Sequence, residues 1–211
     1  MRKIVTILVF LAAGFWANAQ YAGFIPVKDM DKFKVAFALA AQKTNSIKSD
    51  FVQEKVLSML SEKIISKGRF WFKKDNRVRM EYYHPYQYLM ILNKDKVYVK
   101  DGQKENKIST RSNKMFQQIN KIMVDCMQGT ALNNTDFKTR VFENKNSSLV
   151  ELVPVTKGLK ELFKAITVTI DNKDFSVSVI EMQELSGDNT IIRFLNKNLN
   201  ADIQDMLFFI K

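Results

Sequence analysis

The chain lacks most of the residues that metal sites, disulfides and phosphate-binding loops require. Its 211 residues include one cysteine and one histidine, Cys126 and His84. One cysteine excludes an intramolecular disulfide, and one Cys with one His does not make a zinc site. The seven glycines are widely spread and form no glycine-rich phosphate loop. We therefore expect no metal and no other cofactor.

His84 is the one candidate for acid–base chemistry, and it stands beside Pro85 at the end of a predicted strand. No sequence feature places a nucleophile next to it, as a Ser-His-Asp or Cys-His site requires. Cys126 falls on an apolar helical face, where we interpret it as a small hydrophobic residue rather than a nucleophile. An uncharacterised hydrolase would depend on His84, but we interpret the protein as one that is not an enzyme.

Long hydrophobic runs are absent outside the N-terminus. There, two basic residues precede an apolar run from Ile4 to Phe15, followed by the small-x-small sequence Ala17-Asn18-Ala19. These are the three parts of a secretory signal peptide. The run is shorter than the about 20 residues that a membrane span needs. We expect residues 1–19 to be removed before Gln20, which leaves residues 20–211 as a single exported domain.

Acidic residues are in the minority. The 33 Lys and Arg against 22 Asp and Glu give a net charge of +11, which falls by two to +9 when the basic residues of the leader are removed. The basic residues are scattered along predicted strands and turns, without a dense run, and we expect no nucleic-acid partner for an exported protein. The charge favours either a basic solvated face or attraction to anionic lipid head groups.

What the sequence does contain is a strongly alternating hairpin between Gly68 and Pro85. Its two strands differ in character between their faces with a period of two residues, which is typical of half-buried antiparallel strands. The turn Lys74-Asp75-Asn76 uses residues that tolerate a positive φ. The alternation places five large apolar side chains on the inward face: Phe70, Phe72, Val78, Met80 and Tyr82.

The next predicted strand, Tyr86 to Leu92, is apolar on both of its faces. One stripe includes Met90, and the other includes Leu89 and Ile91. The strand is therefore predicted to be covered on both faces or to border a cavity. Because large inward side chains usually just pack a core, core packing and ligand lining remain alternatives here.

A methionine-rich amphipathic helix is predicted from Ser112 to about Gly129. Its apolar residues recur at helical spacing and form a single face. Methionine gives a deformable surface that suits partners of irregular shape, although methionine-rich faces also occur in ordinary cores. The apolar face consists of Met115, Phe116, Ile119, Ile122, Met123, Cys126 and Met127.

The rest of the sequence predicts one more helix and a series of strands. Asp29 is a suitable N-cap for a helix that runs to about Lys43. The strands are separated by polar turns, and the last is expected at Met206 to Ile210. There is no βαβ alternation and no repeat. We therefore predict a mainly β, α+β fold: an unclosed antiparallel β-barrel of about 10–11 strands, with helices packed against its concave face.

Four segments of the chain resemble the LolA family, the periplasmic carriers that take lipoproteins to the outer membrane. The segments are Ser46 to Lys55, Gly68 to Lys74, Tyr83-His84-Pro85 and Leu92 to Val99. Their order and spacing agree with the family pattern over most of the mature chain. The stretch from Leu149 to Glu184 is similar to the later strands of the family.

The resemblance implies an unclosed barrel in which helices form a lid over an apolar cavity that shelters acyl chains. It also implies a periplasmic carrier without catalysis or cofactor. The cargo would be acylated lipoproteins or lipids. An inner-membrane ABC lipoprotein-release complex would supply it, and an outer-membrane acceptor would receive it. We expect the carrier to be a monomer.

Residues of the expected site follow from the inward faces and from this resemblance. Lys74 stands where the family has an Arg that helps to hold the lid shut, so Lys74 is the expected lid latch. Lysine cannot make the forked hydrogen bonds of arginine. Asp75 replaces a proline of the family pattern, and Lys94 replaces a glycine. The expected acyl-chain-binding residues are Phe70, Phe72, Val78, Met80, Tyr82, Met90, Met115, Ile119, Ile122 and Met123.

A periplasmic binding module is the alternative to a carrier. It would use the basic face of the sheet on a protein or on an anionic glycan or lipid. That face carries Arg69, Lys73, Arg77 and Arg79. Function would then depend on these charges, whereas a carrier would depend on the inward apolar residues.

Overall fold

The computed structural model describes residues 21–60, 62–94, 96–102, 104–109 and 114–210. For residues 104–109, 114–117, 119 and 120 it describes the backbone alone. The predicted leader and its cleavage site precede the first of these ranges. Within the described ranges, no helix is long and apolar enough to cross a membrane.

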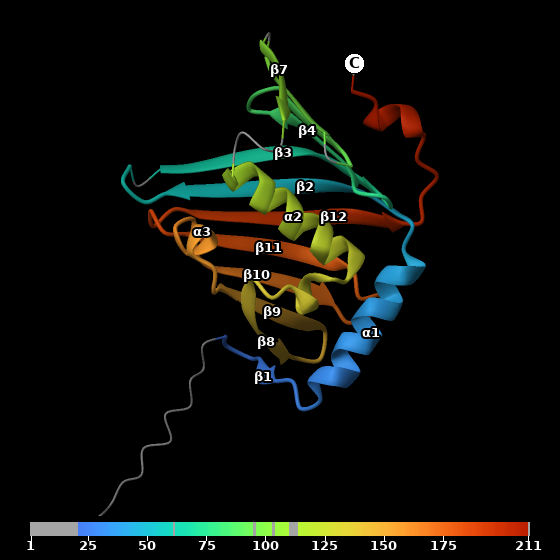
Figure 1. Cartoon of the computed structure of the whole chain (residues 1–211), viewed down its shortest axis with the longest axis vertical. Coiled ribbons are helices and arrows are strands. Elements are labelled where there is room, and N and C mark those ends of the chain that lie inside the picture. The colour runs from blue at the N-terminus through green and yellow to red at the C-terminus, as the bar shows by residue number, and fades with distance from the viewer. Residues whose placement is uncertain (1–20, 61, 95, 103, 110–113, 211) are drawn as a thin grey trace, which may run out of the picture.

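Helix α1 (Met30–Lys43) begins where the sequence predicts, after Asp29. The Asp29 carboxylate accepts a hydrogen bond of 2.9 Å from the backbone N–H of Lys32. This bond satisfies one of the donors that the first turn of a helix leaves unpaired. The helix lies at one end of the sheet (Figure 1). Its buried face consists of Phe33, Phe37 and Ala41.

Strands account for most of the remaining described chain. The first seven are β1 (Ile25–Pro26), β2 (Ser46–Leu57), β3 (Glu62–Lys73), β4 (Arg77–His84), β5 (Tyr88–Asn93), β6 (Lys96–Asp101) and β7 (Lys104–Ser109). After helix α2 (Lys114–Gln128) and the 3-10 turn η2 (Ala131–Asn133) come β8 (Phe137–Glu143) and β9 (Ser147–Pro154). The short helix α3 (Lys157–Lys160) precedes β10 (Phe163–Asp171), β11 (Val177–Glu184), β12 (Asn189–Leu199) and the 3-10 turn η3 (Asp205–Phe208).

The described strands form one antiparallel sheet in the order β1-β8-β9-β10-β11-β12-β2-β3-β4-β5-β6-β7. Two meanders, β2 to β7 and β8 to β12, meet where β12 pairs with β2. In the part of the chain that the structure describes, β1 and β7 are the edges of the sheet, so the curled sheet does not close. Helix α2 connects the two meanders and crosses one face of the sheet (Figure 1). The predicted fold class is confirmed.

Apolar side chains cover both faces of the sheet near its centre. Phe70 and Phe72 of β3 belong to a large cluster that also contains the apolar residues of α2. Trp71 lies between them in sequence and so points to the opposite face, where it packs with Ile91 and Phe208. The two apolar stripes of β5 are thereby explained: one faces α2, and the other faces the C-terminal segment.

The C-terminal segment is not the strand that the sequence predicts for Met206 to Ile210. Residues 201–210, which we call the C-terminal strap, include the turn η3 and cross the outer face of β4 and β5. The apolar side chains of the strap cover the Trp71 cluster instead of pairing with a sheet edge. An alternation of apolar residues over so short a run does not distinguish a strand from an extended strap.

Cations on the outer face hold this segment in place. Lys73 Nζ donates to Asp205 Oδ1 at 2.5 Å and to the Ile203 carbonyl at 2.8 Å. Arg77 Nη1 donates to the same Asp205 oxygen at 2.8 Å, and Arg79 Nη1 donates to the Leu207 carbonyl at 3.1 Å. The hydrogen bond from Lys73, together with the charge of Arg77, lowers the pKa of Asp205.

This lowered pKa gives the strap a pH dependence. The ionised Asp205 contributes stability above the ordinary carboxyl pKa of about 3.9, and the contribution is lost as the pH falls through the lowered folded value. Asp205→Asn should expose Trp71 at pH 7 and shift its fluorescence to the red. Because Trp71 is the only tryptophan after residue 20, the spectrum reports on this cluster alone. The difference between variant and wild type should vanish at low pH.

Asp202→Asn is the matched control, because Asp202 is an exposed aspartate of the same segment, whereas Lys73 and Arg77 bind Asp205. Its spectrum should stay that of the wild type at every pH. Identical pH profiles for the Asp205→Asn variant and the wild type would show that the ion pairs of Asp205 do not hold the C-terminal strap in place.

Candidate functional site

The inner face of β3, β4 and β5 is a continuous apolar surface made of paired residues. Phe70 lies opposite Met80, and Met80 lies opposite Met90. One rung further along, Phe72 lies opposite Val78. All five are buried. The structure therefore brings these five sequence-predicted residues together on one face.

Tyr82 lies at the rim of this surface and is only partly buried. Its hydroxyl donates to Gln53 Oε1 at 2.9 Å, and its ring meets the edge of Phe51 with the ring centroids 4.8 Å apart. Burial raises the pKa of Tyr82, with a smaller contribution from Tyr88. The ring therefore stays neutral at physiological pH, as an apolar lining requires.

Gly68 makes room for this aromatic group. It pairs with Phe51 on one side and with Tyr82 on the other. A Cβ atom at this position would lie 2.5 Å from the Glu81 carbonyl oxygen and closer still to the Phe51 ring. The absent side chain lets the Phe51 ring cross β3, so packing requires a glycine at position 68.

Helix α2 covers the inner face with its methionine-rich side. Ile122 and Met123 are buried in the same cluster as Phe70 and Met90. Gly129 follows the helix with φ of +72°, which is the left-handed conformation of a glycine helix end. The side chains of Met115 and Ile119 are outside the described part of the chain, so their expected contacts stay predictions.

Polar contacts at the C-terminal end of α2 join it to its surroundings. Gln128 Nε2 donates to Asn76 Oδ1 in the β3–β4 turn at 2.9 Å. Gly129 approaches α1 so closely that a Cβ atom there would lie 2.6 Å from Ala41 Cβ. This end of α2 is therefore held by α1 and by the β3–β4 turn. Sequence reasoning missed the Gln128–Asn76 contact, because nothing in the sequence pairs residues 52 positions apart.

Lys74 acts on α1. Its Nζ donates to the Gln42 carbonyl at 2.6 Å, in the last turn of α1. A cation is favoured at that position because the carbonyl ends of a helix carry partial negative charge. Lys74 therefore ties β3 to α1, the helix on which the end of α2 rests. Its role as a lid latch stays a prediction.

The turn after Lys74 explains the departure from the family pattern. Asp75 and Asn76 both have positive φ, at 67° and 57°. Proline is restricted to a φ near −65°, so a proline at position 75 is incompatible with this turn. Lys94 in the next turn also has a positive φ, at 59°, and its N–H donates to the Asn76 carbonyl.

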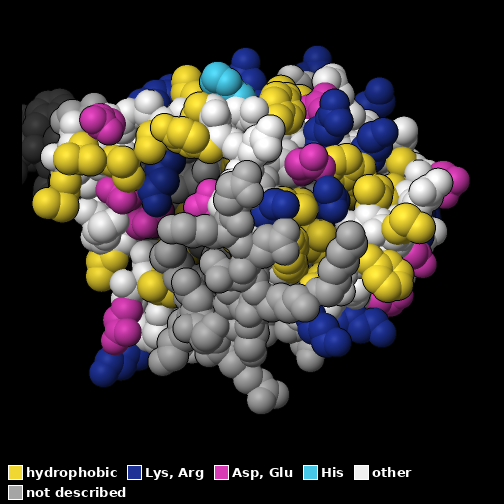
Figure 2. All heavy atoms as spheres, turned by 90° about the horizontal axis from the view of Figure 1, so that it is seen from above, with side chains coloured by type: hydrophobic (Ala, Val, Ile, Leu, Met, Phe, Trp, Pro, Cys, Tyr) yellow, Lys and Arg dark blue, Asp and Glu magenta, His cyan; other side chains and the backbone are white. Residues whose placement is uncertain are grey.

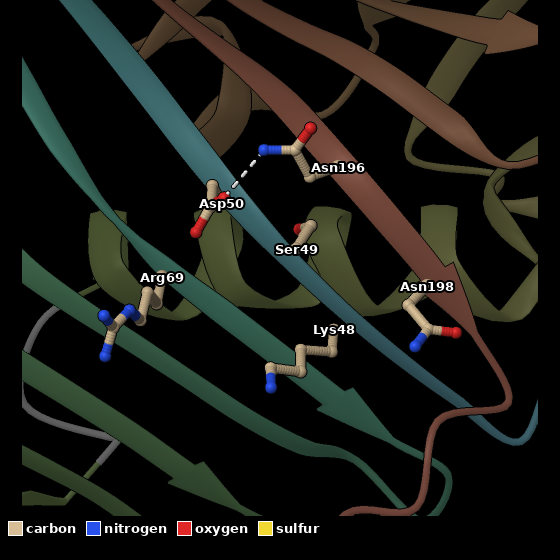
Figure 3. A pocket seen from close by; sticks show the side chains of 6 residues that line it. All are labelled: Lys48, Ser49, Asp50, Arg69, Asn196 and Asn198. Atoms are coloured by element: carbon tan, nitrogen blue, oxygen red, sulfur yellow. Dashed lines mark hydrogen bonds between the residues drawn. The ribbon is translucent and has the colours of Figure 1, made fainter.

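A polar pocket lies on the other face of the sheet (Figure 3). It is located where β12 loses register with β2, between Leu195 and Asn198. Asn196 donates to Asp50 Oδ2 at 2.9 Å across the gap. The lining of the pocket consists of Lys48, Ser49, Asp50, Arg69, Asn196 and Asn198.

The described chain also offers no clear metal site. No group of three or more His, Cys, Asp and Glu side chains there is arranged to hold a metal ion. His84 is exposed at the end of β4. Cys126 lies on the buried side of α2, and burial raises the pKa of its thiol. The candidate site is the apolar inner face together with the helix that covers it, because their buried side chains form one cluster.

An unclosed barrel with an amphipathic helix across its apolar inner face is a carrier or binding fold. The sequence matches the family described as outer membrane lipoprotein carrier protein LolA over residues 42–211. The match covers most of the chain, and the chain therefore belongs to the LolA family. No curated protein sequence matches it.

The solved structures to which this chain is similar are distant from it in sequence. MucB is 11% identical with a TM-score of 0.50, over 85% of this chain and 62% of MucB. The LolA superfamily protein NE2245 from Nitrosomonas europaea is 9% identical with a TM-score of 0.45, over 84% of this chain and 97% of its own. LprF from Mycobacterium bovis is 12% identical with a TM-score of 0.39, over 85% and 96%.

The single cysteine reports how firmly α2 covers the sheet. Cys126 is 2% exposed, so a polar thiol reagent reaches it only when α2 separates from the inner face. Its reaction with Ellman's reagent should be slower by about 100-fold or more than that of an exposed thiol. Leu39→Cys in a Cys126→Ala background supplies the comparison, because Leu39 is exposed on α1. Equal rates would show that α2 does not cover the sheet in solution.

Proposed function

We propose that the protein is a periplasmic carrier that shelters the acyl chains of lipoproteins on the inner face of its sheet, beneath α2. The observation that carries the proposal is the apolar surface shared by β3, β4, β5 and α2. Membership of the LolA family supports the lipoprotein cargo. Residues 20–211 would be the mature, monomeric carrier domain after removal of residues 1–19.

Opening of α2 would expose the binding surface. The described residues of α2 meet the inner face through apolar side chains, and the polar contacts named above lie at its C-terminal end. An acyl chain gains about 0.8 kcal/mol for each methylene that leaves water. A bound chain would therefore replace the apolar contacts that α2 makes in the closed state. Methionine suits this exchange because its side chain adapts to different neighbours.

Transfer requires partners on both membranes. As in the family, an inner-membrane ABC lipoprotein-release complex would load the carrier, and an outer-membrane acceptor would take the cargo. Because the buried chain is costly to expose to water, it should leave only when an acceptor offers another apolar surface. No cofactor takes part in such a transfer.

The alternative function, binding through the basic sheet face, receives less support. Three of its four cations, Lys73, Arg77 and Arg79, bind the C-terminal strap. Charge reversal there would release the strap, so a loss of function would not identify a binding face. Arg69 remains and lines the polar pocket of Figure 3.

A photoreactive fatty acid tests the site without altering the protein. A long-chain fatty acid with a diazirine at its methyl end would be bound to the unmodified chain and irradiated. Mass spectrometry of peptides would then locate the label. We expect it on inner residues such as Met80, Met90 and Met123.

Neighbouring residues of β5 supply the internal control. Met90 faces α2, whereas Ile91 is equally buried but faces the C-terminal strap. Label at Met90 without label at Ile91 would therefore identify the face as well as the strand. Label confined to Ile91 and Trp71, or spread over the surface, would contradict the proposed site.

A further inference from the structure

The end of the β2–β3 hairpin carries exposed hydrophobic side chains that the proposed carrier site does not use. Met59 is 93% exposed and Leu60 is 63% exposed, and both lie in the turn after β2. Val56, Ile64 and Ile65 continue the exposed set along the two strands. We call these five residues the hairpin tip; Ser61, between them, is not described.

The hairpin tip is apolar on both of its faces. Ile64 and Ile65 are adjacent in one strand, so their side chains point to opposite sides of the sheet. A docking surface for a folded protein is a patch on one side, and a stable interface buries roughly 800 Å² on each partner. Five side chains around a narrow hairpin end do not form such a patch. A fluid apolar medium can surround the hairpin end from both sides.

Lysines on both strands next to the hairpin tip form ion pairs within the chain, while the exposed Glu62 adds a negative charge at the start of β3. Lys55 Nζ lies 3.4 Å from Glu184 Oε1, and Lys63 Nζ lies 2.5 Å from Glu54 Oε2. Glu54 also accepts from Arg193 at 2.8 Å. Paired charges cost less than single ones to bring near an apolar phase. The local charge therefore favours shallow apolar insertion over attraction to an anionic surface.

Two exposed tyrosines lie behind the tip. Tyr83 is at the end of β4, and Tyr86 is in the β4–β5 turn. This turn lies beside Lys67, because Lys67 pairs with His84. Lys67 lies five positions along β3 from Glu62, which is about 17 Å along the hairpin. Tyrosine favours the polar interface of a bilayer, so the tyrosines suit the headgroup level when the tip reaches the acyl region.

Figure 1 shows the β2–β3 turn at one extremity of the sheet, on the side away from α1. Figure 2 shows hydrophobic side chains at that end of the molecule, among charged ones. Leu185, in the β11–β12 turn, is exposed beside the hairpin. Ser58 holds that turn through Asp188 Oδ1, which accepts from the Ser58 N–H at 3.0 Å. The neighbouring turn therefore supports the hairpin and extends its apolar end.

We propose that the β2–β3 hairpin tip inserts into the surface of a lipid bilayer and docks the protein there reversibly. Docking would rest on Met59 and Leu60, with Tyr83 and Tyr86 among the head groups. It would be shallow, because the tip is short and helix α2 and the inner face take no part in it. The inference goes beyond acyl-chain binding and does not depend on it.

Flotation with vesicles tests the inference on the protein that begins at Gln20. Vesicles of phosphatidylcholine alone should carry the protein upward, and added salt should not release it. Met59→Asp with Leu60→Asp should weaken this binding by at least about 10-fold, since two apolar side chains are lost and two charges are gained. The matched control is Val35→Asp with Leu39→Asp, which changes two exposed apolar residues of α1 and should float like the wild type.

Three results would overturn the inference: no flotation of the wild type, equal flotation of the tip variant, or binding that needs anionic lipid and is lost in salt. The last would assign membrane contact to the basic surface instead. Uptake of a fluorescent fatty acid from solution separates this inference from the proposed function. The tip variant should take it up normally, and failed uptake by a wild type that still floats would count against the carrier alone.

Discussion

Packing of α2 against the inner face of the sheet is the contact on which the rest of the structure depends. The sheet does not close on itself in the described chain, so its inner apolar residues need a cover. α2 provides it and thereby completes the main core. The same surface is the proposed binding site, so core packing and ligand binding compete for the same side chains. An apolar ligand must contribute at least what the helix gives up.

The polar contacts are placed so that this exchange is feasible. Gln128 ties one end of α2 to the β3–β4 turn, Gly129 brings that end close to α1, and Lys74 ties α1 to β3. The outer face has its own cover, the C-terminal strap held by Asp205. Under the proposed mechanism, separation of α2 would therefore leave the outer cluster intact. One side of the sheet could then change while the other side keeps its shape.

Sequence reasoning predicted the sheet and its inward residues because alternation in a strand determines the face directly. Met90 and Phe72 are local consequences of a period of two. It failed for Met206 to Ile210, where a short alternating run forms a strap instead of a strand. The ion pairs of Asp205 with Lys73 and Arg77, and the contact between Gln128 and Asn76, join distant parts of the chain. No local pattern encodes such pairs, and only the folded chain brings them together.

The central claim is that the chain carries acyl groups beneath α2, and native mass spectrometry tests it most directly. The mature protein would be purified from periplasm without detergent and weighed intact, and its lipids would then be extracted. The account predicts a bound population whose added mass is a lipid or an acylated peptide. A clean apo mass, with no uptake of added fatty acid or lipoprotein, would contradict it.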